Sequence, residues 1–421
     1  MGEVLMSDTH GRPGPLPAPE DRWLTLPGRK RVLVVVHTVT YGQRLRDAFS
    51  LLEGDLRIQL VFTAAPHALG EGTGGFLDEL GAAALPWQEA VRTRFDLALA
   101  AGSRGIEKVR GPLVRLSHGA GHIKLLRGGR PAAADGRPAG MLSRQYLTRG
   151  GRVVPAAIAL AHERDLDELA RWCPEAVPAA AVVGDPCYDR ILSSLPLRDT
   201  YRRALGVGPR QHLVVVTTTW GPSASFGRFD ALLPRLIGEL APDRYRVAAL
   251  VHPNVWAGHG GRQIRTWLAG VRAQGLTLVP PETDWRALLV AADTVIGDHG
   301  SLTSYATVAP RVPVLVARFP EDEVHPSSPA AALARTAPAL SPLHPLESQL
   351  EYAAAEYRQR EYERVAALIS SEPGRFNRRM RTLMYRLLGL GQPAYAPVTE
   401  PAAVPPRLDG GAARRPAGPR A

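Results

Sequence analysis

Residues 293–305, DTVIGDHGSLTSY, have the pattern of a buried strand that turns directly into a helix. The first part is a short apolar run between polar ends, which is typical of a strand in a parallel sheet. Gly297 and Gly300 then allow a tight turn, and Ser301 can cap the helix that follows. Free backbone N–H groups at such a turn favour a phosphate, and His299 would add a donor that can carry charge. An ordinary capped turn explains the same residues, so the interpretation depends on the rest of the chain.

The composition indicates an ordinary cytosolic protein. At 421 residues the chain is long enough for two domains with full cores. No run approaches the roughly 18 to 20 apolar residues of a membrane span, and residues 1–28 lack the apolar centre of a signal peptide. The two cysteines, Cys173 and Cys187, cannot form a disulfide framework, and neither has a metal-ligand spacing.

The formal net charge of +11 raises the question of a nucleic-acid or anionic-lipid partner. Only three of the 51 basic residues are lysines, and this bias is better explained by a GC-rich genome than by a partner. No basic patch is interleaved with aromatic residues that could stack bases. The sequence therefore predicts no nucleic-acid partner.

Strands and helices alternate in two successive series. The predicted strands are 31–36, 57–63, 95–100, 113–116 and 179–183 in the first series, and 213–217, 246–251, 276–279, 294–296 and 312–316 in the second. Such alternation predicts parallel sheets with helices on both faces. The fold class is therefore α/β, with two Rossmann-like domains facing a cleft.

The predicted boundaries follow from the two series. They are a disordered segment at 1–28, an N-terminal domain at 29–197, a C-terminal domain at 198–350, C-terminal helices at 351–390 and a disordered tail at 391–421. In the first domain we expect a loop at 37–42 before a helix at about 43–52.

The last helix has apolar side chains on one face and arginines on the others. This pattern predicts either docking on the core or attachment to an anionic membrane surface.

The segment 117–124, SHGAGHIK, directly follows a predicted strand. A neutral imidazole at His118 can take a proton from an attacking hydroxyl. Lys124 is one of only three lysines, so a merely structural cation would more often have been arginine, although a solvated basic loop explains the segment too. A metal pair of His118 and His122 is disfavoured because two glycines lie between them and no third ligand is evident.

Three further segments end predicted strands with polar side chains. Thr218 and Thr219 follow one strand, and His252 closes the next before a proline that keeps the backbone extended. The other candidates belong to the opening stretch and are Asp298, His299, Gly300, Ser301 and Thr303. No P-loop, nucleophile-elbow, zinc-protease or Cys-x-x-Cys motif is present. Two domains with histidines in the loops that face each other are suited to bind a nucleotide-diphosphate-linked donor, whose pyrophosphate would then need no metal ion.

In order and spacing, several segments resemble the CDP-glycerol glycerophosphotransferases of teichoic acid synthesis. The matching segments are 116–124 (LSHGAGHIK, like that family's His-Gly with a trailing Lys), 183–189 (VGDPCYD, like its Gly-x-Pro-x-x-Asp), 217–220 (TTTW, like its Pro-Thr-Trp), 251–253 (VHP, like its His-Pro) and 297–301 (GDHGS, like its Ser/Thr-Asp-Tyr-Ser-Ser with three positions altered). The resemblance covers roughly residues 113 to 317.

The resemblance implies a glycosyltransferase-B-like fold and a metal-independent transferase without a cofactor. An acceptor hydroxyl would attack the β-phosphorus of a CDP-linked donor, and a nucleoside monophosphate would leave. The N-terminal domain would take the acceptor and the C-terminal domain the donor. The implied site has His118 and His252 as catalytic residues, with His118 as general base, and Lys124, Thr218, Thr219, Asp298, His299, Gly300, Ser301 and Thr303 around the donor phosphates. The implied partners are the CDP-linked donor, a hydroxyl acceptor that can be lipid-linked, and an anionic surface at the inner face of the cell membrane.

Two other functions remain open from the sequence. A nucleotide-sugar glycosyltransferase or sugar-nucleotide epimerase shares the two-lobed fold, and a non-catalytic nucleotide-binding scaffold would need the fold alone. Measuring which nucleotide-linked compound stabilises the protein against unfolding would distinguish these functions from the transferase.

Overall fold

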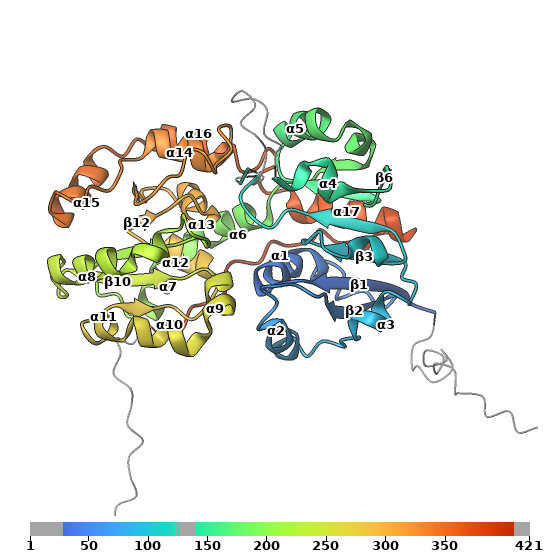
Figure 1. Ribbon diagram of the computed structural model, residues 1–421, viewed down its shortest axis with the longest axis horizontal. Helices are drawn as coiled ribbons and strands as arrows, with labels where there is room; N and C mark the ends of the chain where they lie inside the picture. The colour runs from blue at the N-terminus through green and yellow to red at the C-terminus, as the bar shows by residue number, and fades with distance from the viewer. Residues whose placement is uncertain (1–27, 123, 126–139, 408–421) are drawn as a thin grey trace, which may run out of the picture.

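The computed structural model describes residues 28–122, 124–125 and 140–407, which form two units side by side (Figure 1). Each unit is built on one parallel sheet, with six strands in the first and five in the second. The predicted α/β class with two Rossmann-like units is thereby confirmed. The predictions made for residues 1–27 and 408–421 lie outside the described residues.

The first sheet has the strand order β2-β1-β3-β4-β7-β8. Strand β1, which pairs with β2 and β3, is buried from Val32 to Val36, with Val32 and Val34 in one core and Leu33 and Val35 in the other. This explains the continuous apolar run, because helices cover both faces of the sheet. The strands are β1 (Lys30–Val36), β2 (Ile58–Ala64), β3 (Leu97–Ala100), β4 (Leu113–Leu116), β7 (Ala157–Leu160) and β8 (Ala180–Val182).

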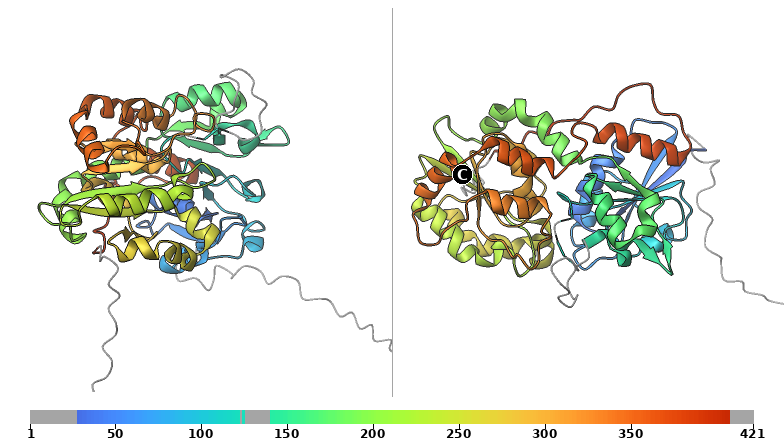
Figure 2. Two further views of the ribbon diagram at one scale, coloured as in Figure 1. Left: turned by 60° about the vertical axis from the view of Figure 1, so that its left-hand side comes forward. Right: turned by 90° about the horizontal axis from the view of Figure 1, so that it is seen from above.

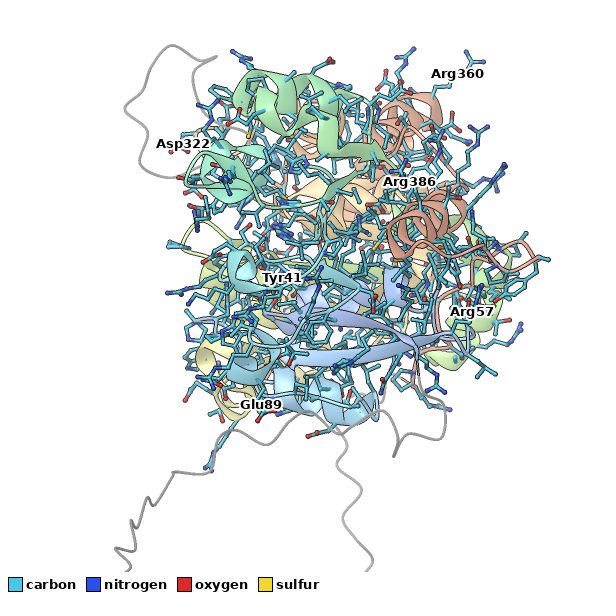
Figure 3. All side chains as sticks on the ribbon, turned by 90° about the vertical axis from the view of Figure 1, so that its right-hand side faces the viewer. Tyr41, Arg57, Glu89, Asp322, Arg360 and Arg386 are labelled. Atoms are coloured by element: carbon cyan, nitrogen blue, oxygen red, sulfur yellow. The ribbon has the colours of Figure 1, made fainter. Side chains whose placement is uncertain are left out.

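Helix α1 (Val39–Phe49) begins four residues earlier than the sequence predicts. Its cap is Thr38, whose hydroxyl accepts a hydrogen bond from the Tyr41 N–H at 3.3 Å. The predicted loop at 37–42 is therefore wrong, and Tyr41 lies on the first turn of a helix (Figure 3). The other elements of this unit are α2 (Thr73–Glu79), α3 (Trp87–Ala90), α4 (Arg144–Leu147), the hairpin β5 (Thr148–Arg149) and β6 (Arg152–Val153), and α5 (Arg164–Trp172).

The second sheet has the strand order β11-β10-β9-β12-β13, with β12 between β9 and β13. Its strands are β9 (His212–Thr217), β10 (Tyr245–Leu250), β11 (Thr277–Leu278), β12 (Thr294–Gly297) and β13 (Val314–Val316). The opening stretch of the sequence is thus a strand near the centre of this sheet, followed by the short helix α13 (Ser301–Tyr305).

Helix α6 (Pro186–Ser194), capped by Asp185, lies between the two units (Figure 1). The helices around the second sheet are α7 (Arg198–Ala204), α8 (Phe229–Glu239), α9 (Pro253–His259), α10 (Gly261–Trp267), α11 (Ala269–Ala273), α12 (Trp285–Ala291), α14 (Pro329–Thr336), α15 (Leu346–Ala355) and α16 (Gln359–Ala367). They cover both faces, as the parallel pairing requires.

The last helix, α17 (Phe376–Leu388), returns to the first unit (Figures 1 and 2). Its apolar face, including Phe376, Met380 and Met384, is buried in the core beneath the first sheet. Helix α17 therefore docks on the core, which is the first of the two roles predicted for it. Arg386 is on the exposed face of α17, and Arg360 is exposed on α16 (Figure 3). No helix among the described residues is long and apolar enough to cross a membrane.

Residues 391–407 are predicted to be disordered, but the structure shows part of this segment held against the protein. Ala402 is buried, its N–H donates to Ser194 Oγ at 2.8 Å, and its carbonyl accepts from the Tyr201 hydroxyl at 2.7 Å. Side chains of the two units thus supply the hydrogen bonds that this irregular, Pro-rich segment cannot form within itself.

Candidate active site at the junction of the two sheets

The candidate residues follow the carboxyl ends of strands in both sheets, which is where parallel sheets bind ligands. His118 follows β4 of the first sheet, and His252 follows β10 of the second. The two sides touch, because a Cβ atom on Gly119 would overlap the Oγ atom of Ser301 and lie 3.3 Å from its Cβ. His252 is close enough to His118 to disfavour protonation of His118 electrostatically. The structure therefore brings the two histidines and Ser301 together.

The His118 side chain is exposed to solvent at this junction. Its ring packs against that of Tyr41, with the centroids 4.6 Å apart. Neither ring nitrogen has a hydrogen-bond partner among the described residues. Both nitrogens are therefore available to a ligand, and ring packing rather than a carboxylate orients the imidazole.

Three residues outside the predicted site gather beside His118. The rings of His37, Tyr41 and His67 lie 6.2 to 6.3 Å apart in edge-to-face pairs. His37 directly follows β1, and His67 follows β2 by three residues. The signal that could have found the two histidines is the one that indicates His118, namely a histidine just beyond a strand of a parallel sheet.

Arg115, on β4, supplies a buried positive charge below this cluster. It is only 3% exposed, and its guanidinium donates to the carbonyls of Ala100 at 3.3 Å and Leu116 at 2.6 Å and to Ser103 Oγ at 3.0 Å. Among the described residues it forms no ion pair. Its charge therefore disfavours protonation of the imidazoles nearby.

Asp298 is fully occupied by the protein. Its carboxylate accepts hydrogen bonds from the backbone N–H groups of Thr219 at 3.0 Å, Ser225 at 2.9 Å and Gly300 at 3.0 Å. The Ser225 hydroxyl adds a further bond at 3.0 Å. This carboxylate fixes the loop after β9 against the turn after β12.

Two predicted phosphate ligands are also used inside the protein. The Thr218 hydroxyl donates to the Thr219 carbonyl at 2.8 Å, and the Thr303 hydroxyl pairs with that of Thr217 at 2.9 Å. Both threonines are buried. The N–H of Gly300 is directed to Asp298, and α13 is only five residues long. A phosphate here would therefore depend on side chains more than on the helix dipole.

Lys124 joins the first unit to the second. Residue Lys124 forms an antiparallel bridge with Val324, and the Leu125 N–H donates to the Glu323 carbonyl at 3.0 Å. The ammonium group lies 4.4 Å from the centroid of the Trp220 ring and donates to the Trp220 carbonyl at 3.2 Å. This places a cation from the first unit over a residue that follows β9.

His252, His299 and Ser301 line the other side of the junction. The Nδ1 atom of His252 accepts from the Asn254 N–H at 3.0 Å, so the neutral ring carries its proton on Nε2. His299 is buried, and its Nδ1 atom has no partner among the described residues. Ser301 is partly exposed, and its hydroxyl has no such partner either. These three side chains keep polar atoms available, unlike Asp298 and Thr303.

Electrostatics keep the histidines neutral at pH 7. Burial and then the charge of Lys124 lower the pKa of His252 to about 3. The pKa of His118 is also lowered below its usual value. The protein displaces water from around the ring, although part of the side chain stays exposed, and the charges of Arg115 and then His252 add to this effect. Burial also lowers the pKa of His299. A neutral imidazole can accept a proton or donate one N–H, so the site is equipped for proton transfer and for binding an anion by hydrogen bonds.

We expect His37 to make the fold sensitive to acid. Its ring is fully buried, Nε2 donates to the Arg104 carbonyl at 2.7 Å, and burial lowers its pKa from 6.5 to about 4. Because the unfolded state binds the proton more readily, stability falls as the pH drops from 6.5 towards 4, by about 3 kcal/mol from this residue. Urea midpoints at pH 7 and pH 4.5 should differ less in His37→Gln than in the wild type. The control is His344→Gln, at an exposed position. If the difference between the two midpoints is as large in His37→Gln as in the wild type, or is reduced as much in His344→Gln, the assignment to His37 is wrong.

The contact between Gly119 and Ser301 also gives an expected result. A methyl group at Gly119 overlaps Ser301 Oγ, which can rotate away, and lies 3.3 Å from Ser301 Cβ, so Gly119→Ala should destabilise the protein by only about 1 kcal/mol through overpacking. Ser301→Ala removes the overlapping atom, and the double variant should regain more than half of that loss. The measurement is a double-mutant cycle of denaturation midpoints. Strict additivity would mean that the two loops do not touch in solution.

No protein-family model matches the sequence, and no curated protein matches it either. Among the described residues, no group of three or more His, Cys, Asp or Glu side chains is arranged to hold a metal ion.

The two parallel sheets, whose loops after the carboxyl ends of the strands face each other, define a glycosyltransferase-B-like fold. Solved structures of this fold match the chain. The wall teichoic acid polymerase TagF, in a variant soaked with CDPG, matches with a TM-score of 0.59 at 11% identity, over 86% of this chain and 88% of that one. S. aureus MnaA in a structure with UDP matches with a TM-score of 0.51 at 13% identity, over 88% and 100%. The UDP-GlcNAc 2-epimerase from Methanocaldococcus jannaschii matches with a TM-score of 0.50 at 12% identity, over 84% and 99%. At these identities the likeness establishes the fold.

Proposed function

We propose that the protein is a metal-independent transferase that moves a glycerophosphate-like (polyol phosphate) group from a CDP-linked donor to a hydroxyl acceptor in the synthesis of a cell-envelope polymer. The observation that carries this proposal is that Gly119, the residue after His118, touches Ser301 of the second unit, while His252 lies near enough to act on the charge of His118. The likeness of the fold to TagF supports the same reaction class.

In the proposed reaction, the oxygen of the acceptor hydroxyl forms a bond to the β-phosphorus of the donor. The bond from that phosphorus to the bridging oxygen breaks, and cytidine monophosphate leaves with the oxygen. His118 takes the proton of the hydroxyl, for which its neutral state is the competent one. His252 offers Nε2–H to the donor phosphates, and Lys124 lies near enough to His252 to add positive charge.

The remaining predicted ligands divide into two groups under this proposal. Ser301 and His299 contact the phosphates with polar atoms that the protein leaves available. Asp298, Thr218, Thr303 and Gly300 act indirectly, since their polar groups hold the loops in place. Thr219 belongs with this second group through its backbone N–H.

The test is a thermal-shift screen of the full chain with CDP-glycerol, CDP-ribitol, UDP-sugars and GDP-sugars. A ligand at 100 times its dissociation constant should add about 2.7 kcal/mol of stability. We expect stabilisation by a CDP-linked polyol, its loss in His252→Ala and its retention in His118→Ala, since His118 acts on the acceptor. Stabilisation by UDP-sugars alone would favour a nucleotide-sugar enzyme, for which the likeness to MnaA with UDP is the supporting observation. No stabilisation by any of them would overturn the proposal and leave a non-catalytic scaffold.

A further inference from the structure

One face of helix α1 is directed at the junction of the two units. Tyr41, Arg44 and Asp47 follow one another at a spacing of three, which puts them on the same side of the helix. Tyr41 packs on the ring of His118, and Asp47 pairs with Arg286 of α12 at 2.8 Å. Arg44 lies between these two contacts and is only 5% exposed.

Arg44 connects the backbone beside His118 to a buried carboxylate. Its Nε atom donates to the Ser117 carbonyl at 3.0 Å, and its Nη2 atom donates to Asp185 Oδ2 at 2.7 Å. Ser117 is the residue before His118, so this bond restrains the peptide that carries the imidazole.

Asp185 continues the connection into the second unit. It is fully buried, and its Oδ2 atom also accepts a hydrogen bond from the Tyr305 hydroxyl at 2.9 Å. Tyr305 is the last residue of α13, and Ser301, the first, packs against Gly119. Helix α13 is therefore connected to both neighbours of His118, by direct contact on one side and through Asp185 and Arg44 on the other.

We propose that Arg44, Asp185 and Tyr305 are positioning residues that hold His118 at a fixed place relative to α13. The inference rests on the proposed function, because it assigns importance to the position of a base beside the donor phosphates. A buried ion pair adds little net stability compared with apolar side chains of the same volume, and the role that we assign to this one is the geometry that it imposes. Misplacing a catalytic group by about 1 Å can cost on the order of 100-fold in rate, so such a restraint matters.

The test uses two conservative variants and a matched control for each. Tyr305→Phe removes only the hydroxyl, and Arg44→Lys keeps the charge while losing the paired donors, so both should fold. The controls are Tyr362→Phe, which removes a buried hydroxyl bonded to the Val314 N–H at 3.1 Å, and Arg46→Lys, an exposed position on the same helix. The His118 ring signal is followed by NMR in the ligand-free full chain with labelled histidine and is assigned from its absence in His118→Gln.

We expect the His118 signal to shift or broaden in Tyr305→Phe and Arg44→Lys and to stay unchanged in both controls. With a donor that supports transfer, kcat should fall on the order of tenfold in these two variants while KM for the donor stays the same. An unchanged His118 signal in both variants would overturn the inference. A changed signal in a protein that transfers no group from any tested donor would support the positioning role and overturn only the proposed function.

Discussion

Replacing His118 by alanine is expected to lower the rate of group transfer by about 10²- to 10⁴-fold, which is the usual contribution of a general base. The donor should still stabilise the protein, because the groups proposed to contact its phosphates are Ser301, His299, His252 and Lys124. Steady-state transfer with the donor identified by thermal shift measures the first effect, and the shift itself measures the second. Turnover within twofold of the wild type would remove the assignment of His118.

The pH dependence adds a second readout to the same variant. Since the pKa of His118 is lowered, the ring stays unprotonated as the pH falls through 6.5, where an ordinary histidine becomes charged. The wild-type rate should therefore not decline between pH 8 and pH 6. The control is His344→Asn, an exposed histidine just before α15 in the second unit. It should leave both the rate and its pH dependence close to those of the wild type.

The fold could be predicted from the sequence because strands such as β1 and β9 are buried over most of their length and therefore appear as continuous apolar runs. The stretch at 293–305 became β12 and α13 with nearly the predicted limits. The predicted start of α1 is too late although Thr38 is a good cap residue, since the apolar periodicity begins only later in that helix. The Pro-rich composition of residues 391–407 predicts disorder, because composition does not show that side chains elsewhere bind this backbone.

The site was predictable only in part, for a different physical reason. The position of a histidine after a strand can be found locally, and His118 and His252 were found in this way. Which polar groups remain available depends on partners far away in the sequence. The local pattern predicts Asp298 as a phosphate ligand, whereas its carboxylate is bonded to Thr219 and Ser225, 79 and 73 residues away. Arg44 has a partner at a separation of 141 residues, which no local pattern indicates.

Replacing Asp298 by alanine is expected to destabilise the protein by about 3–5 kcal/mol, because it leaves several buried N–H groups without an acceptor. Asp298→Asn should cost less, since one oxygen of the side chain can still accept. Because the loop after β9 and the turn after β12 both depend on this carboxylate, we also expect weaker stabilisation by the donor in proportion to the stability lost. Urea unfolding, with and without the donor, measures both effects.

The matched control is Asp293→Ala at the other end of β12. Asp293 binds Arg198 and Arg202, both at 2.6 Å, and accepts from the Leu213 N–H at 2.8 Å, so it is a structural carboxylate remote from the junction. It should lose stability while the donor still stabilises it as strongly as the wild type. If Asp298→Asn loses the effect of the donor but keeps the stability of the wild type, Asp298 contacts the donor itself, and its structural role as argued from the hydrogen bonds is wrong. If instead both losses occur together, the carboxylate serves the donor by holding Thr219, Ser225 and Gly300 where the phosphates need them.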